Sequence, residues 1–145
     1  MNDTLATFGY PMSALREYEH WAILLRPHQV TMGSMVVCTV GRETRMADMA
    51  STAFAELELV FTGAEGALRG AFGAEKINHM MLMMVDPHVH WHLIPRYSGA
   101  RTVGSTTIAD EGWPALPDLG SGVQLPDSDR AALRATLLAA WPDGT

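Results

Sequence analysis

The sequence of 145 residues has one cysteine, little positive charge and no long apolar run. Because Cys38 is alone, it cannot form an internal disulfide or supply the several thiolates of a zinc knuckle, which favours a reducing compartment. No apolar run reaches the roughly 18 residues needed to span a bilayer. The first ten residues do not follow the pattern of a secretory signal. We therefore expect a cytoplasmic protein without a membrane segment.

The charge balance limits the partners of the chain. Ten Lys and Arg residues stand against 16 Asp and Glu residues, which gives a formal net charge of -6. Binding to a nucleic-acid backbone draws on counterion release by cationic side chains, so this balance argues against a nucleic-acid partner. The 48% of hydrophobic residues is enough for a core and excludes a disordered chain. Length and composition predict one domain over residues 1–145.

Apolar patterning predicts four strands and two helices. The strands are expected at residues 20–26, 35–40, 76–85 and 89–95. One helix is expected at about 52–71 with Ser51 as its N-cap, and another at about 128–141, capped by Asp127 or Ser128. Residues 97–126 are rich in Gly, Pro, Ser, Thr and Asp, which predicts a long ordered loop or a partly mobile arm. Strands interrupted by one main helix indicate an α+β fold with an antiparallel sheet.

Three of the six histidines alternate with apolar residues in the segment HVHWHLIPR, residues 88–96. Successive side chains of a strand point to opposite faces, so His88, His90 and His92 are expected on one face and Val89 and Trp91 in the core. Three imidazoles on one face need partners for six ring nitrogens or must face solvent. We therefore interpret them as a functional face rather than as half-buried structural residues.

Two chemistries fit this face. A His-x-His pair with a remote third ligand suits a metal ion, although the outer histidines, about 13 Å apart, cannot both join it. Alternatively, a neutral imidazole attacks phosphorus and forms a labile phosphoramidate. In that case His90 is the nucleophile, and His88 and His92, about 6.6 Å away, fix its tautomer or donate to the phosphoryl oxygens. Only the second chemistry gives all three histidines a role.

The segment HVHWHLIPR resembles the His-x-His-x-His signature of the histidine-triad (HIT) superfamily of nucleotide hydrolases and transferases. The resemblance covers about residues 15–97 and leaves 98–145 as a C-terminal extension. It implies an α+β domain that pairs its sheet with that of a second copy, forming a homodimer. It also implies that His90 forms a nucleotidyl-histidine at an α-phosphate, which water or another acceptor resolves, without a cofactor or a metal.

Three further residues are candidates for substrate binding. Asn78 stands ten residues before His88, where HIT proteins often have a polar residue that contacts the nucleotide. Arg96 follows the triad and is placed to balance phosphate charge. Arg26 lies near the position at which HIT proteins carry an Asp or Asn for the ribose, and we expect it to bind phosphate or carboxylate instead.

The sequence also departs from the HIT pattern just before the triad. The usual Gly-Gln-Ser/Thr is replaced by Met83, Met84 and Val85, so polar contacts to the phosphate are lost. A nucleotide-binding regulatory protein with little catalysis and a metalloenzyme built on a His-x-His pair are the alternative hypotheses. Because the chain has no strong positive field, a small nucleotide or a singly charged phosphoryl ester is expected rather than a highly charged polyphosphate.

Overall fold

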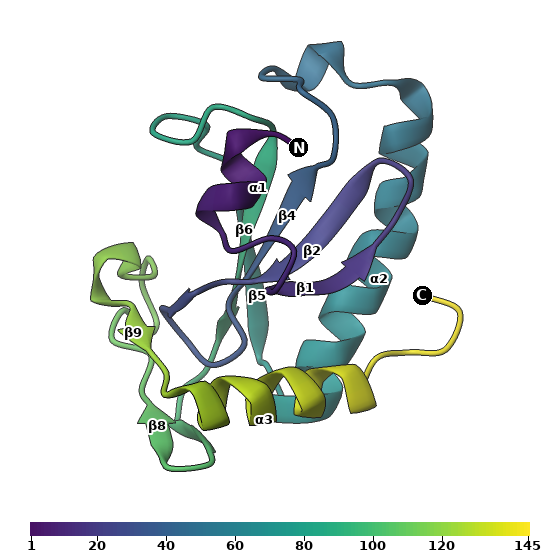
Figure 1. The fold of residues 1–145 in the computed structure, drawn as a ribbon. Helices are drawn as coiled ribbons and strands as arrows, with labels where there is room; N and C mark the ends of the chain where they lie inside the picture. The colour runs from purple at the N-terminus through teal and green to yellow at the C-terminus, as the bar shows by residue number, and fades with distance from the viewer.

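In the computed structural model, which describes residues 1–145, a five-stranded antiparallel sheet has a long helix on one face and a short N-terminal helix on the other (Figure 1). The strands lie in the order β1 (Ala14–Glu17), β2 (Trp21–Leu25), β4 (Met35–Thr39), β6 (His90–Arg96) and β5 (Lys76–Met80). The helices are α1 (Asp3–Thr7), α2 (Ser51–Phe72) and α3 (Asp127–Ala139). None of them is long and apolar enough to cross a membrane. The predicted α+β fold with an antiparallel sheet is confirmed.

The larger core lies between the sheet and α2. Alternate residues of β2, namely Trp21, Ile23 and Leu25, point into it and are almost fully buried. The indole Nε1 of Trp21 also donates to the carbonyl of Ala53 at 2.8 Å, which ties the strand to the first turn of α2. The α3 helix crosses the ends of the strands and adds Leu133 and Leu137 to the same core (Figure 1).

Two of the glycines in α2 allow the C-terminal tail to approach the helix. A Cβ at Gly63 would lie 2.6 Å from the indole nitrogen of Trp141, and one at Gly66 would contact the ring of Pro142. Glycine costs a helix about 1 kcal/mol relative to alanine. Here the missing side chains make room for Trp141, which is 6% exposed and belongs to the core.

The opposite face of the sheet carries the histidines. Cys38 on β4 pairs with His90 on β6, and Val36 pairs with His92. Apolar side chains of β2 and β4 on this face pack against the α1 segment in a small cluster. It is composed of Leu5, Phe8, Ala22, Leu24, Val36 and Cys38. Trp91 and Leu93 point to the α2 side, as strand alternation predicts.

The strand predicted at residues 76–85 is wrong in its second half. β5 ends at Met80, and Met83 has a φ of 45°. A left-handed backbone cannot continue an extended strand, and the loop leaves Met84 83% and Val85 93% exposed. The predicted helix caps are also wrong. Ser51 and Asp127 are the first helical residues, and the positions before them, Ala50 and Pro126, have no side-chain cap bond.

Residues 97–126 contain more regular structure than the sequence predicts. They include β7 (Arg101–Val103), β8 (Thr106–Ile108), a 3₁₀ turn η2 (Leu119–Ser121) and β9 (Val123–Gln124). β7 and β8 pair as a hairpin, and β9 pairs with β3 (His28–Gln29). Another 3₁₀ turn, η1 (Met46–Asp48), precedes α2. Strands of two or three residues are too short for alternation to reveal them, which explains why the sequence predicts only a loop.

Candidate active site

His90 and His92 lie on β6 in the middle of the sheet. β6 runs between β4 and β5, and both side chains are deeply buried, at 2% and 7% exposure. Their rings meet edge to face with centroids 4.9 Å apart. The predicted shared face is therefore confirmed for these two histidines.

The tautomer of His90 follows from one hydrogen bond. Its Nδ1 lies 2.6 Å from the backbone carbonyl oxygen of His88. Because a carbonyl only accepts, Nδ1 carries the proton, and the lone pair of the neutral ring is on Nε2. No group of the protein hydrogen-bonds to Nε2. His90 thus presents a fixed, unoccupied nitrogen lone pair, suited to nucleophilic attack.

His88 lies in a bend just before the start of β6, so it does not project from the strand itself. Its ring lies against α1, which covers the same face of the sheet as His90 and His92. Its backbone N–H donates to the hydroxyl of Thr4 at 3.3 Å, and its Nδ1 is 3.0 Å from the same oxygen. The ring is therefore attached to α1. The backbone carbonyl of His88, rather than its ring, orients His90.

His92 is neutral at pH 7. Burial, and then the proximity of the His90 imidazole and the Arg26 guanidinium, lower its pKa to about 4. Its Nδ1 is buried without a hydrogen-bond partner in the protein. An uncompensated buried polar atom is costly in a structural position, and such atoms are found at sites that bind ligands.

The helix α1 covers the histidine face. The Phe8 ring, just beyond the helix, has its centroid 5.8 Å from that of His90 and 5.7 Å from that of His92. Asn2 anchors this segment, since its Oδ1 accepts from Leu5 N and its Nδ2 donates to the carbonyls of Thr39 and Gly41. The sequence prediction missed α1, although an Asn followed by an acidic residue is a usual helix start.

Asn78 and Arg96 lie on the β5 side of the histidines and are bound to each other. Arg96 Nη1 donates to Asn78 Oδ1 at 2.8 Å, while Nε and Nη2 donate to the Asp110 carboxylate at 2.7 and 3.1 Å. Burial opposes the ionised form of Asp110, but these bonds from Arg96 keep its pKa below the ordinary value. The charge of Arg96 is thus compensated inside the protein, and Asn78 keeps its Nδ2 amide free to donate.

Asp110 is a member of this network that the sequence prediction missed. It lies 14 residues after Arg96 in the Gly- and Pro-rich segment, where no periodicity marks its position. A cavity of about 430 Å³ adjoins the network. Its lining includes Asn78, Met80, Arg96 and residues 114–117. Met80 pairs with His92 in the sheet, which places the cavity beside the histidine face.

Arg26 approaches the histidines from the β2 side. Its Nη1 donates to the carbonyl of His28 at 2.7 Å, and its Nε is buried with no partner. Burial lowers the pKa of the guanidinium, and its charge is close enough to affect His92. No carboxylate pairs with it. The candidate substrate residues therefore lie on both sides of β6, with Arg26 on one side and Asn78 and Arg96 on the other.

The remaining groups near the site do not form a metal centre. No three His, Cys, Asp or Glu side chains come together in a way that could hold a metal ion. Cys38, next to His90 across the sheet, is fully buried, and burial raises the pKa of its thiol to about 12. A thiol with that pKa is not a thiolate at pH 7, so Cys38 is a small core residue and not a nucleophile.

Comparison with solved structures finds histidine-triad proteins. A HIT protein from Sinorhizobium meliloti 1021 matches with a TM-score of 0.76 at 18% identity, over 97% of this chain and 95% of its own. A histidine triad protein from Marinobacter aquaeolei VT8 matches with a TM-score of 0.67 at 21% identity, over 98% and 97%. A hypothetical histidine triad nucleotide-binding protein from Sulfolobus tokodaii strain 7 matches with a TM-score of 0.66 at 17% identity, over 88% and 82%.

No family model matches the sequence, and no curated protein matches it either. The structural likeness, however, extends beyond residues 15–97 into the C-terminal part. The chain therefore has a HIT-like fold, as the triad motif implies.

Proposed function

We propose that the protein is a nucleotide hydrolase or nucleotidyl transferase that acts at an α-phosphate through a covalent nucleotidyl-histidine on His90. The observation that carries the proposal is the bond from His90 Nδ1 to the His88 carbonyl, which leaves the Nε2 lone pair free. A neutral imidazole in this state needs no separate base to attack phosphorus. The HIT-like fold supports the same chemistry, as does the description of the Sulfolobus protein as nucleotide-binding.

The reaction takes place in two displacements. His90 Nε2 attacks the phosphorus, and an N–P bond forms. The bond from phosphorus to the leaving group breaks, P–O in an anhydride or ester and P–N in a phosphoramidate. Its electron pair goes to the leaving oxygen or nitrogen, and a leaving amine takes up a proton from solvent. The ring then carries a positive charge, which the His88 carbonyl stabilises through the proton on Nδ1. Water or another acceptor attacks the phosphorus, loses its proton, and breaks the N–P bond, which returns the electron pair to Nε2.

The proposed supporting roles follow from the geometry. His92, neutral and close to His90, donates a ring N–H to a phosphoryl oxygen, and His88 holds α1 beside the site through Thr4. Asn78 donates its free amide to the substrate in the adjoining cavity. Arg96 acts through Asn78, because its own charge is compensated by Asp110. Arg26, which has no carboxylate partner, binds a phosphate or carboxylate oxygen.

The covalent step is tested with adenosine 5′-phosphoramidate as the substrate. Intact-protein mass spectrometry after rapid quenching should show one adenylyl group, and peptide mapping should place it on His90. His90→Ala should abolish the adduct and lower turnover by at least about a hundredfold. His20→Gln removes a histidine that bonds Thr52 in the first turn of α2, on the opposite face of the sheet, so it should retain the adduct and the rate. Wild-type turnover by His90→Ala would refute the mechanism.

A nucleotide-binding regulatory protein is the second candidate. It is favoured by the loop before the triad, in which Met84 and Val85 are exposed and supply no polar contact to phosphate. Tight binding of AMP in calorimetry, with neither turnover nor adduct at high protein concentration, would select it.

We also propose that the chain forms a homodimer through β5. This strand is an edge of the sheet, with β6 on one side only. An unpaired edge offers backbone N–H and C=O groups to a second strand, and a second copy of β5 would extend the sheet across the two chains.

A further inference from the structure

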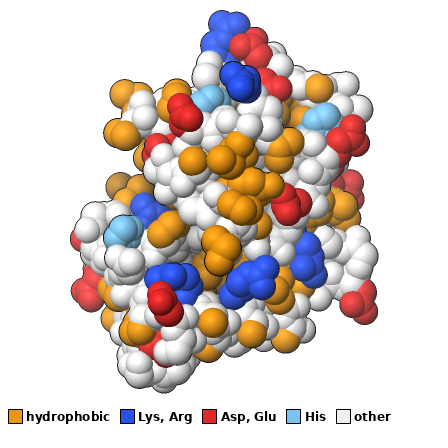
Figure 2. Space-filling view, viewed as in Figure 1, with side chains coloured by type: hydrophobic (Ala, Val, Ile, Leu, Met, Phe, Trp, Pro, Cys, Tyr) orange, Lys and Arg blue, Asp and Glu red, His pale blue; other side chains and the backbone are white.

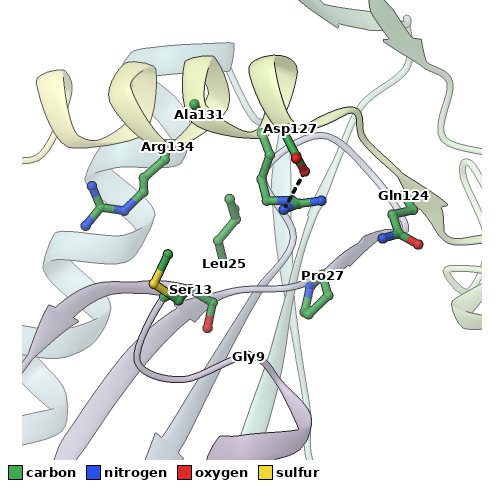
Figure 3. A pocket seen from close by; sticks show the side chains of 10 residues that line it. Gly9, Ser13, Leu25, Pro27, Gln124, Asp127, Ala131 and Arg134 are labelled. Carbon is green, nitrogen blue, oxygen red and sulfur yellow. Dashed lines mark ion pairs between the residues drawn. The ribbon is translucent and has the colours of Figure 1, made fainter.

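A second cavity, of about 520 Å³, lies under α3 (Figure 3), and none of the histidines lines it. Its walls come from the loop after α1, the end of β2 and the first half of α3. The lining residues are Gly9, Met12, Ser13, Leu25, Pro27, Gln124, Asp127, Arg130, Ala131 and Arg134. Leu25 belongs to the core on the α2 side of the sheet, opposite the face that carries His90 and His92. We call this space the α3 cavity.

Two arginines on successive turns of α3 line the α3 cavity, and their guanidinium groups point to opposite sides of Leu25 (Figure 3). Arg134 donates to the carbonyl of Ala14 at 3.0 Å and has no carboxylate partner. Arg130 donates to the carbonyl of Leu125 at 3.2 Å and lies 3.3 Å from Asp127. The Asp127 side chain is 98% exposed, so this ion pair is at the surface and contributes little to stability. Although the whole chain is acidic, the charge at this cavity is therefore net positive.

The rest of the wall is largely apolar. Met12, Leu25, Pro27 and Ala131 contribute hydrocarbon surface, and Figure 2 shows Lys and Arg side chains gathered beside hydrophobic ones above α3. Cavities of roughly 300–1,000 Å³ with an apolar wall and a few polar groups are typical of small-molecule sites. A guanidinium binds carboxylate, sulfonate or phosphate oxygens with charge-assisted hydrogen bonds.

We propose that the α3 cavity binds an amphipathic organic anion, a molecule with one anionic group and an apolar body. The anionic group pairs with Arg130, and the apolar body lies against Leu25 and Met12. Arg134, on the other side of Leu25, adds its positive charge to the attraction (Figure 3). Asp127 competes with the anion for Arg130, which keeps the affinity below what two free guanidinium groups would give. This site is separate from the proposed nucleotide site, and its existence does not depend on that function.

The test uses 1-anilinonaphthalene-8-sulfonate, a fluorescent anion with an apolar body, titrated into the folded full-length chain. Saturable binding of one probe per chain is expected. Arg130→Gln with Arg134→Gln should weaken binding at least about tenfold, because the charge-assisted contact to Arg130 and the nearby positive charge of Arg134 are both lost. Asp127→Asn should strengthen binding about two- to fivefold, because the competing carboxylate is gone.

The matched control is Arg42→Gln with Arg69→Gln, which removes the same total charge at exposed positions outside the cavity and should leave the affinity within about twofold. Non-saturable binding, or equal weakening in the control, would overturn the proposal. If circular dichroism shows that the double glutamine variant is unfolded, Asp127→Asn tests the proposal instead. Unchanged or weaker probe binding in that variant would contradict the competition between Asp127 and the anion for Arg130. Displacement of the probe by decanoate or by phenyl phosphate identifies the preferred anionic group, and displacement by neither would also overturn the proposal.

Discussion

Protonation of His92 should destabilise the folded protein between pH 6.5 and pH 4. Burial lowers the pKa of this residue from the ordinary 6.5 to about 4 in the folded chain. Within that range the unfolded chain binds a proton that the folded chain does not, so the free energy of unfolding falls as the pH falls. The effect is absent well above pH 6.5 and reaches its limit below about pH 4.

The size of the effect follows from the difference between the two pKa values. At about 1.36 kcal/mol per pH unit, charging His92 in the folded chain costs about 3 kcal/mol in full. Between pH 8 and pH 5 the loss is about 2 kcal/mol. Urea unfolding of the wild-type chain and of His92→Gln at both pH values measures this loss. The carboxylates and the other histidines titrate in both proteins, so their contribution cancels in the comparison. The wild-type chain should lose about 2 kcal/mol more than the variant on going from pH 8 to pH 5.

Equal losses in the two proteins would refute this account of His92. An independent readout is the titration of the imidazole carbon-bound protons by NMR, in which His92 should shift with a midpoint near pH 4. A midpoint near the ordinary 6.5 would show that the ring is more hydrated than its 7% exposure implies. That result would contradict the lowered pKa on which the neutral state of His92 depends.

Two further predictions concern the β5 side of the sheet. Asp110→Asn should lower the free energy of unfolding by about 3–5 kcal/mol, because it leaves the buried Arg96 guanidinium without a counter-charge. Asp48→Asn, which breaks the exposed pair with Arg45, should cost about 1 kcal/mol or less in the same urea titration, and similar losses for both would contradict the role of burial. Pairing through β5 predicts a mass of twice 15.8 kDa by light scattering. A monomeric mass at every protein concentration measured would exclude pairing through β5.

The central strands and the histidine face could be predicted because their patterns are local. β2 and β4 are short apolar runs bounded by turn residues, and the structure pairs them as antiparallel neighbours. Alternation along β6 correctly separates His90 and His92 from Trp91 and Leu93. These predictions needed only the side-chain period of a strand and the tendency of apolar faces to be buried.

The groups around the histidines could not be predicted because tertiary contacts determine them. His88 fits the alternating pattern, yet its ring leaves the strand for the Thr4 hydroxyl on α1. In the sequence, Arg96 resembles a solvated charge at the end of a strand. Only the folded chain shows that its guanidinium is buried and paired with Asp110. β5 ends at Met80, and the loop that follows has a positive φ at Met83, a conformation that the residue type does not indicate.

One short segment connects the two sites. Phe8 covers His90 and His92, and three of the residues that follow it, Gly9, Met12 and Ser13, line the α3 cavity. The Ser13 hydroxyl donates to the Phe8 carbonyl at 2.6 Å, so the cover of the histidines and the wall of the cavity are held together by a direct bond. At its other end the segment is fixed by Asn2 to the carbonyls of Thr39 and Gly41. In the proposed mechanism, a substrate reaches His90 past this segment. Both of its anchors lie outside the histidine motif, so the motif alone gives no information about them.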